Sequence, residues 1–180
     1  MKTPSDEELM LAVGKGDFSA FEQIVLRHQK SAWYTAYRFL GDRTIAEDVA
    51  QEAFLKILDA AERYRTTAKF RTYLHGVVTH LCLDSARKKQ PIYVDDLAAV
   101  SGPSPSPPDA VASQERDEAV RKALNTLRPN QRMAVVLRYY EGLSGREIAA
   151  AMEVSPKAVE RLLARARTVL AVLLKDFLEK

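Results

Sequence analysis

Three basic side chains near the end of the chain stand four residues apart, a spacing suited to contacting phosphates or base edges of DNA. Lys157, Arg161 and Arg165 share one face of a predicted helix. The opposite face is apolar and is expected to pack; it holds Val159, Leu163, Ala166 and Leu170. An isolated basic helix of this kind is more commonly the solvated surface of a helical hairpin, so the preceding residues decide between the two interpretations.

Those preceding residues predict a helix-turn-helix. Ser144 and Glu147 have the spacing of a capping box, which indicates that a short helix begins at residue 145. Three residues, 153–155, then separate it from Pro156, which suits the first position of the last helix because its missing amide is harmless there. A short helix, a tight turn and a longer basic helix form a motif that enters the DNA major groove.

A second basic segment, residues 62–89, carries seven bases against two acids. The bases are Arg63, Arg65, Lys69, Arg71, Arg87, Lys88 and Lys89. Aromatic rings are interleaved with them: Tyr64, Phe70, Tyr73 and His75. Cationic groups beside exposed rings suit single-stranded or locally opened nucleic acid, because bases stack on rings while phosphates pair with Lys and Arg. We expect Phe70 to lie in the core instead.

An acidic segment precedes the basic one. Residues 42–59 hold five acids and two bases, and a capping box at Thr44 and Glu47 predicts where this third helix begins. Taken alone, an acidic helix is usually just solvated. Beside a nucleic-acid-binding segment, an acidic face that also carries Gln51 suggests a basic protein partner.

Helix signals continue through the rest of the chain, and no strand pattern or internal repeat occurs. Ser5 and Glu8 predict the cap of a first helix, and Asp17 predicts the cap of a long second helix ending before Gly41. A fourth helix is expected from Phe70 to Lys89, a fifth stopped by Pro129 and a sixth ended by Gly142. The fold class is therefore all-α.

One segment interrupts the helical pattern. Residues 90–114 hold five of the eight prolines, three acids and no Lys or Arg. Proline fixes φ and removes a backbone donor, so we expect an extended, Pro/Ser-rich linker. It divides the chain into helical domains at residues 1–89 and 115–180.

Composition excludes several classes of protein. There is one cysteine, Cys82, and the three histidines are scattered, so we expect no disulfide, metal site or cofactor. No Ser-His-Asp arrangement or Gly-rich phosphate loop indicates an enzyme. The acidic N-terminus is unlike a signal peptide, and no apolar run is long enough for a membrane helix. A cytoplasmic protein without membrane insertion is expected.

The three charged segments together resemble the extracytoplasmic-function (ECF) subfamily of bacterial RNA polymerase sigma factors, over nearly the whole chain. The polymerase-binding helix of region two resembles AEDVAQEAF, and its promoter-reading and melting segment resembles KFRTYLHGVVTHLCLDSARKK. Region four resembles LRPNQRMAVVLRYYEGLSGREIAAAMEVSPKAVERLLARARTVL. The resemblance implies a four-helix region two and a helix-turn-helix region four. It also implies a non-enzymatic factor that directs polymerase to promoters, in a stress or envelope response.

The resemblance assigns roles to individual residues. The clamp of the largest polymerase subunit would contact Asp48, Gln51, Glu52 and Leu55. The downstream (−10) promoter element would contact Arg63, Arg65, Lys69, Arg71, Tyr73, His75 and His80. The upstream (−35) element would contact Ser155, Lys157, Glu160, Arg161 and Arg165. The polymerase flap is a further expected partner, and the resemblance allows for an anti-sigma factor.

This chain departs from the family pattern at four places. Tyr73 stands where the family usually has Trp, and His80 where it usually has Asn, which affects the downstream base preference. Gly76 and Val77 replace the aromatic pair of housekeeping relatives, which implies weaker intrinsic melting and stricter promoter choice. Glu153 occupies a turn position that often carries Gly, so we expect a left-handed residue there.

The alternative is a stand-alone helix-turn-helix regulator that binds operator DNA without polymerase. It would explain the last helix but not the acidic helix or the basic aromatic segment. Such regulators also usually dimerise to read two half-sites, and the sequence shows no spare apolar helix for that purpose.

Overall fold

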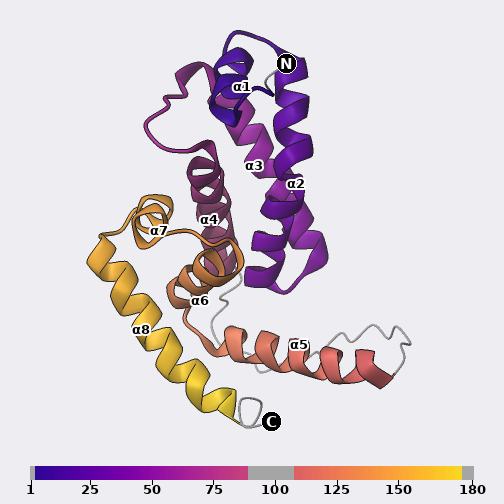
Figure 1. Ribbon diagram of the computed structural model, residues 1–180, viewed down its shortest axis with the longest axis vertical. Coiled ribbons are helices and arrows are strands. Elements are labelled where there is room, and N and C mark those ends of the chain that lie inside the picture. Colours follow the sequence, from indigo (N-terminus) through magenta and orange to yellow (C-terminus); the bar gives the residue numbers. More distant parts are fainter. Residues whose placement is uncertain (1–2, 89–107, 176–180) are drawn as a thin grey trace.

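The computed structural model describes residues 3–88 and 108–175, and every regular element in these two stretches is a helix (Figure 1). The N-terminal bundle consists of α1 (Asp6–Val13), α2 (Phe18–Leu40), α3 (Arg43–Asp59), a 3₁₀ turn η1 (Ala61–Arg63) and α4 (Phe70–Lys88). The C-terminal bundle consists of α5 (Pro108–Thr126), α6 (Pro129–Val135), a π-helical segment η2 (Val136–Tyr140), α7 (Gly145–Met152) and α8 (Pro156–Leu173). The predicted all-α class is confirmed.

Side-chain caps fix where the helices begin. The Ser5 hydroxyl accepts from the Glu8 amide at 3.2 Å while Glu8 accepts from the Ser5 amide at 2.7 Å, so the predicted capping box is confirmed. Asp17 caps α2 as predicted. The predicted cap of α3 is wrong. Asp42 accepts from the amide of Ile45 at 3.0 Å, so α3 begins two positions earlier in the sequence than a Thr44 cap would require.

The extended conformation predicted for residues 90–114 is also wrong at its C-terminal end. The helix α5 begins at Pro108, so residues 108–114 are helical. Proline is compatible with a helix at its first position, where the backbone amide has no partner within the helix. The remainder of the predicted linker, and Lys89 at the predicted end of α4, lie outside the described residues.

The predicted sixth helix changes its pitch before it ends. After Val135 the backbone widens into η2, in which the Glu141 amide donates to the carbonyl of Val136 at 3.2 Å, five residues earlier. Gly142 then ends the segment at φ 66°. Such π-helical turns are rare and occur frequently at functional sites. Here the turn places Glu141 directly against the N-terminal bundle.

The two bundles pack on each other through α4 and α7, which lie side by side in Figure 1. Gly76 in α4 lies against Ala151 in α7, where a Cβ atom added to Gly76 would lie 3.6 Å from the Ala151 Cα atom, an ordinary van der Waals contact. Phe39 and Phe70 are buried in the N-terminal bundle, and Met133 and Ile148 are buried in the C-terminal bundle. These side chains belong to one continuous apolar core that spans both bundles.

No helix among the described residues combines the length and apolar character needed to cross a membrane.

Candidate functional site

The residues assigned to polymerase binding form an exposed face on α3, which we call the polymerase face. Asp48, Gln51, Glu52 and Leu55 are all exposed, while Ala53 and Phe54 on the other side of the helix are buried. Leu55 is 61% exposed, and it also lines an apolar groove beside this face. The face thus combines acidic groups with an apolar side chain that nothing in the described chain covers.

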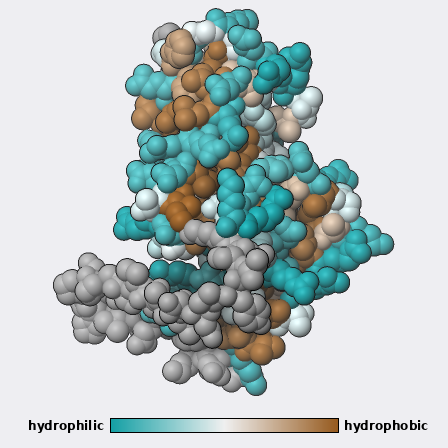
Figure 2. Space-filling view, turned by 180° about the vertical axis from the view of Figure 1, so that it is seen from behind, coloured by the Kyte–Doolittle hydropathy of each residue, from teal (hydrophilic) through white to brown (hydrophobic). Residues whose placement is uncertain are grey.

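An apolar groove adjoins the polymerase face between α2 and α3. Its volume is about 710 Å³, and its walls include Phe21, Val25, Trp33, Tyr34, Phe54 and Leu55, with Gln51 and Lys30 among the polar groups. Trp33 stacks on Tyr37 with a centroid distance of 5.0 Å, which fixes the indole at the edge of the groove. Figure 2 shows apolar surface on the part of the molecule that α1–α4 form, the upper half of both views.

The groove was not predicted from the sequence. Trp33 and Tyr34 are adjacent on α2, and adjacent aromatic side chains cannot both point into one core. That adjacency was the available signal, since side chains one position apart face different directions on a helix.

The basic residues assigned to the downstream element surround the connection between α3 and α4. Arg63, Arg65 and Lys69 are exposed in this connection, and Arg71 is about half exposed at the start of α4. Tyr73 and His80 are partly buried on the same helix. The structure thus places these six side chains around one connection and the helix that follows it.

The aromatic rings of residues 64–73 pack together and support the connection between α3 and α4. Phe70 is fully buried, as expected, and Tyr64 is buried beside it with a centroid distance of 6.4 Å. Burial raises the pKa of the Tyr64 hydroxyl to about 12, with Glu7 nearby adding to the shift. Tyr73 lies 5.4 Å from the Tyr64 ring and extends the cluster toward the surface.

Glu7 also fixes where α4 begins. Its carboxylate accepts a hydrogen bond from the amide of Phe70 at 2.7 Å. A carboxylate at a helix N-terminus is favourable because the first amides have no partner within the helix. This contact between α1 and α4 was missed, because it joins residues 63 positions apart.

His75, which was expected to contact the downstream element, is not accessible to DNA in this conformation. Its side chain has no exposed surface, and its ring faces the carboxylate of Glu141 at 3.4 Å. A group that solvent does not reach cannot stack on a base. His75 shares the basic, aromatic segment with Tyr73, but the helical turn directs it into the contact between the bundles.

We call the side chains assigned to the downstream element and placed around the start of α4 the downstream surface: Arg63, Arg65, Lys69, Arg71, Tyr73 and His80. The polymerase face and the downstream surface meet in a hollow between α3 and α4. Asp48 and Glu52 line it from α3, and Tyr73 and His80 line it from α4. Its volume is about 670 Å³. Residues assigned to two partners from separate stretches of sequence therefore lie next to each other.

The residues assigned to the upstream element lie on the exposed side of α8. Ser155, Lys157, Glu160, Arg161 and Arg165 are all exposed. The Ser155 hydroxyl accepts from the Ala158 amide at 3.2 Å and so caps the helix at its predicted start. Val159 and Ala166 on the opposite side are buried, as the apolar spacing predicted.

The turn before α8 has the predicted left-handed residue. Glu153 has φ 53° and ψ 44°, and among the described residues it is the single non-glycine at positive φ. The Val154 amide donates to the carbonyl of Ala149 at 3.0 Å, and the Glu153 amide donates to Ala150 at 3.3 Å. This pair of bonds forms a Schellman motif, which ends α7 and redirects the chain into α8.

The helix-turn-helix lies over part of the downstream surface. Ala150, Ala151 and Glu153 close one side of a hollow whose other side includes Tyr73 and His80. The Glu153 carboxylate lies 3.2 Å from the Nε2 atom of His80. The two candidate DNA-binding elements therefore contact each other in this structure.

An all-helical chain with a helix-turn-helix, a basic aromatic helix and an acidic helix defines a class of transcription protein that meets both DNA and a protein partner. Residues 24–92 match the Sigma-70 region 2 family, and residues 117–170 match Sigma-70, region 4. The chain is 32% identical to the ECF RNA polymerase sigma factor SigW of Bacillus subtilis, over 91% of this chain and 94% of that protein. It is also 32% identical to the ECF RNA polymerase sigma factor SigE of Mycolicibacterium smegmatis, over 98% of this chain and 70% of the relative.

The chain therefore belongs to the ECF family of RNA polymerase sigma factors. Sigma factors bind core RNA polymerase and direct promoter-specific transcription initiation, and the family is not enzymatic. The stand-alone regulator considered from the sequence is not favoured, because region two matches as well as region four.

Solved structures agree with this assignment. The fold is similar to that of CnrH in its complex with the cytosolic domain of CnrY, with a TM-score of 0.73 and 27% identity over 96% of this chain and 99% of that one. It also resembles the sigma factor RpoE in complex with the anti-sigma factor NepR from Bartonella quintana, with a TM-score of 0.67. At 21% identity, over 86% of this chain and 96% of that one, the second likeness concerns the fold alone.

Proposed function

We propose that this sigma factor binds the clamp of the largest polymerase subunit through its polymerase face, Asp48, Gln51, Glu52 and Leu55. The downstream element is bound by the exposed groups around the start of α4: Arg63, Arg65, Lys69, Arg71, Tyr73 and His80. The upstream element is bound by the exposed side of α8: Ser155, Lys157, Glu160, Arg161 and Arg165. The chain acts in the cytoplasm, with residues 1–89 and 115–180 as its two functional regions.

The observation that carries this proposal is the chemical difference between the exposed faces of α3 and α8. The α3 face joins two carboxylates to an exposed Leu55 and an apolar groove, which suits a basic, partly apolar protein surface. The α8 face presents Lys157, Arg161 and Arg165, which suit phosphates and base edges.

An anti-sigma factor is a second proposed partner. CnrH was solved with the cytosolic domain of CnrY, and the likeness to CnrH spans both bundles of this chain. The apolar groove between α2 and α3 offers an open apolar surface for an amphipathic helix of such a partner.

The test of the polymerase face is the affinity of Glu52→Lys for core RNA polymerase. Glu52 is 56% exposed and pairs only weakly with Lys56 at 3.6 Å. We therefore expect the fold to stay intact when the charge of Glu52 is reversed. If Glu52 meets a basic group in a desolvated contact, affinity falls by about 2–5 kcal/mol. Binding measured by fluorescence anisotropy with labelled sigma factor reports the change directly.

Glu118→Lys is a matched control. Glu118 is 57% exposed on α5 and pairs with Lys122 at the same helical spacing, so it undergoes the same charge reversal away from the polymerase face. We expect its affinity for core polymerase to stay at the wild-type value. Equal weakening by the two variants would contradict the assignment of Glu52, because it would trace the loss to net charge alone.

A further inference from the structure

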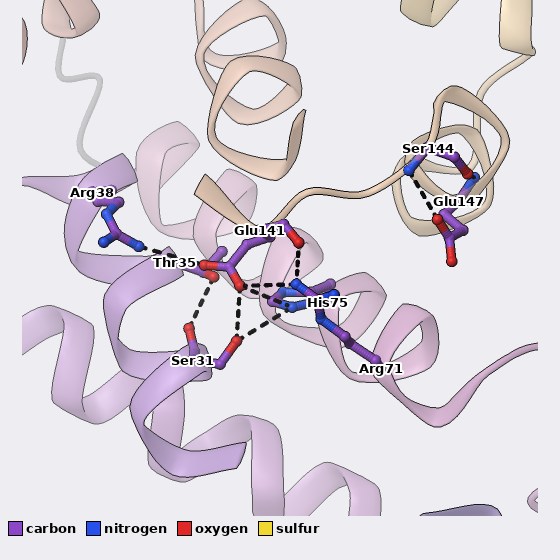
Figure 3. Close-up of polar contacts among 8 residues, drawn as sticks. All are labelled: Ser31, Thr35, Arg38, Arg71, His75, Glu141, Ser144 and Glu147. Carbon is purple, nitrogen blue, oxygen red and sulfur yellow. Dashed lines mark hydrogen bonds and ion pairs between the residues drawn. The ribbon is translucent and has the colours of Figure 1, made fainter. Parts of the chain in front are cut away.

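A buried carboxylate connects the two bundles. Glu141, at the end of η2, is 7% exposed, and four side chains of the N-terminal bundle surround it (Figure 3). The Ser31 hydroxyl donates to its Oε2 atom at 2.9 Å, and the His75 Nε2 atom lies 3.4 Å from the same oxygen. Arg38 and Arg71 approach its oxygens at 3.5 Å and 3.6 Å, and Arg71 also donates to the Glu141 backbone carbonyl.

All of these partners belong to α2 and α4, so the Glu141 carboxylate keeps these ion pairs and hydrogen bonds only while the two bundles are in contact. A buried charge is strongly unfavourable unless it is paired and hydrogen-bonded. Arg38 and Arg71 are 32% and 49% exposed and regain water readily when the bundles separate. In the closed arrangement, the Glu141 carboxylate is therefore stabilised by its buried partners, and in an open arrangement it is stabilised by water. In a partly separated arrangement it would have neither these partners nor full hydration.

The closed arrangement covers part of the surface proposed to bind the downstream element. With α7 against α4, Ala151 approaches Gly76, and Glu153 reaches His80 on the same exposed side. Ala150 and Ala151 face Tyr73 across a hollow of about 270 Å³. In the closed arrangement α7 therefore covers one side of Tyr73 and His80, while their other side lines the hollow between α3 and α4.

We propose that Glu141 is the latch of a self-inhibited closed state, in which region four covers the downstream-element surface of region two until the Glu141 contacts with Ser31, Arg38, Arg71 and His75 are broken. This inference rests on the proposed function of α4. The latch makes docking of α7 compete with DNA binding by the part of α4 that α7 covers. Free factor is thereby kept from binding DNA through region two.

The first test measures opening in the full chain by small-angle X-ray scattering. Glu141→Gln removes the charge but keeps the size, so a latch predicts a larger radius of gyration and an open population raised at least about tenfold. Ser31→Ala, which removes one hydrogen bond from the N-terminal side, should open the chain by less. Glu118→Gln, an exposed carboxylate in an ion pair within α5, should remain closed.

Circular dichroism at the scattering temperature separates opening from unfolding. Unchanged helicity with a larger radius supports the latch. The latch is overturned if the Glu141→Gln chain keeps the wild-type radius of gyration. It is also overturned if the Glu141→Gln chain expands only in proportion to its loss of helicity while the Ser31→Ala chain stays closed.

The second test locks the closed state. Cysteines replacing Gly76 and Ala151 face each other across the contact between α4 and α7, and loss of free thiol on oxidation is measured first, to establish that the disulfide has formed. The probe is fluorescein-labelled single-stranded DNA of mixed sequence. The oxidised chain should bind it several-fold more weakly than the same chain after reduction, and Glu141→Gln should bind it several-fold more tightly than wild type. Equal affinity before and after reduction overturns the proposal.

The scattering test involves no DNA, so failure of the latch and failure of the proposed DNA-binding function of α4 are distinguishable. If Glu141→Gln opens the chain but does not change its affinity for single-stranded DNA, the latch holds and the assignment of α4 to DNA is lost. If Glu141→Gln leaves the chain closed, the latch is lost, whatever the DNA affinity.

Discussion

The carboxylate of Glu153 lies 3.2 Å from the Nε2 atom of His80, which joins the turn of the helix-turn-helix to the helix proposed to bind the downstream element. Both side chains keep substantial exposure, 76% for Glu153 and 46% for His80, so this pair contributes little to stability. The backbone of Glu153 matters more, because its φ of 53° is unfavourable for a residue with a side chain.

Replacing Glu153 with glycine should therefore stabilise the protein slightly. The left-handed conformation costs a non-glycine residue roughly 1–2 kcal/mol, while glycine loses about 0.4–1 kcal/mol through its unfolded-state entropy. With the weak His80 contact also removed, we expect a net gain of about 0.5 kcal/mol in the free energy of unfolding, measured by urea denaturation. Glu153→Ala is the control, since it removes the carboxylate but keeps the strain and should not stabilise. We expect promoter choice to stay the same, and a changed preference would place the Glu153 side chain on DNA.

Local patterns predicted this turn and most helix starts correctly, because a cap or a Schellman motif involves residues within five positions of one another. The contacts of Ser5 with Glu8 and of Ser144 with Glu147 are of this kind. The error at Thr44 arose from two competing local caps, of which the structure uses Asp42. Pro108 was misjudged because the rule that proline breaks helices does not apply to a first turn.

The parts that could not be predicted depend on long-range packing. Glu7 meets the Phe70 amide across 63 positions, and Glu141 meets Ser31 across 110. Neither residue differs in its local pattern from an ordinary surface carboxylate. The family resemblance assigned His75 to DNA for the same reason, since a motif gives the residue type but not the direction in which a partner bundle lies.

Replacing Arg161 with alanine should weaken binding of the polymerase holoenzyme to promoter DNA. If Arg161 reads a base, we expect a loss of about 1–3 kcal/mol and relaxed choice at one position of the upstream element. A loss that is uniform across promoter sequences would mark it as a phosphate contact. The measurement is a competition between promoter duplexes that differ at single positions. Arg167→Ala is the control, because Arg167 lies on a different side of α8 and contacts the Leu163 carbonyl. An effect of Arg167→Ala as large as that of Arg161→Ala would contradict the assignment of one DNA-binding face.

Replacing Gly14 with alanine should destabilise the N-terminal bundle. Its backbone conformation, with φ −62°, suits any residue, but an added Cβ atom would lie 2.7 Å from the carbonyl oxygen of Ala61. That oxygen is backbone, so α1 or η1 must shift, at a cost of about 1–3 kcal/mol in the free energy of unfolding. Gly145→Ala is the control, since a Cβ atom there meets nothing within 4 Å. Equal denaturation midpoints for the two variants would contradict the close contact.

The burial of His75 should make the stability of the protein depend on pH. The pKa of the His75 imidazole is lowered to about 4, chiefly by burial; Glu141 opposes this shift, and Arg71 and His28 add to it. The same group has a pKa near 6.5 in an unfolded chain. Below about pH 6.5 the unfolded chain binds a proton that the folded chain does not. The stability associated with neutral His75 is therefore fully present above pH 6.5 and is lost as the pH falls toward 4.

Between pH 7.5 and 5.5, we expect His75 to account for a loss of about 1.4 kcal/mol in the free energy of unfolding, because the difference in bound protons integrates to about one pH unit over this window. The measurement is urea denaturation of the wild type and of His75→Gln at both pH values. The variant cannot titrate at this position, so its stability should fall by about 1.4 kcal/mol less than that of the wild type over the same window. It has its own penalty for the replaced ring, which cancels when the two pH values are compared. If both proteins lose the same stability, His75 is protonated equally in the folded and unfolded chains, and the neutral buried imidazole beside Glu141 is contradicted.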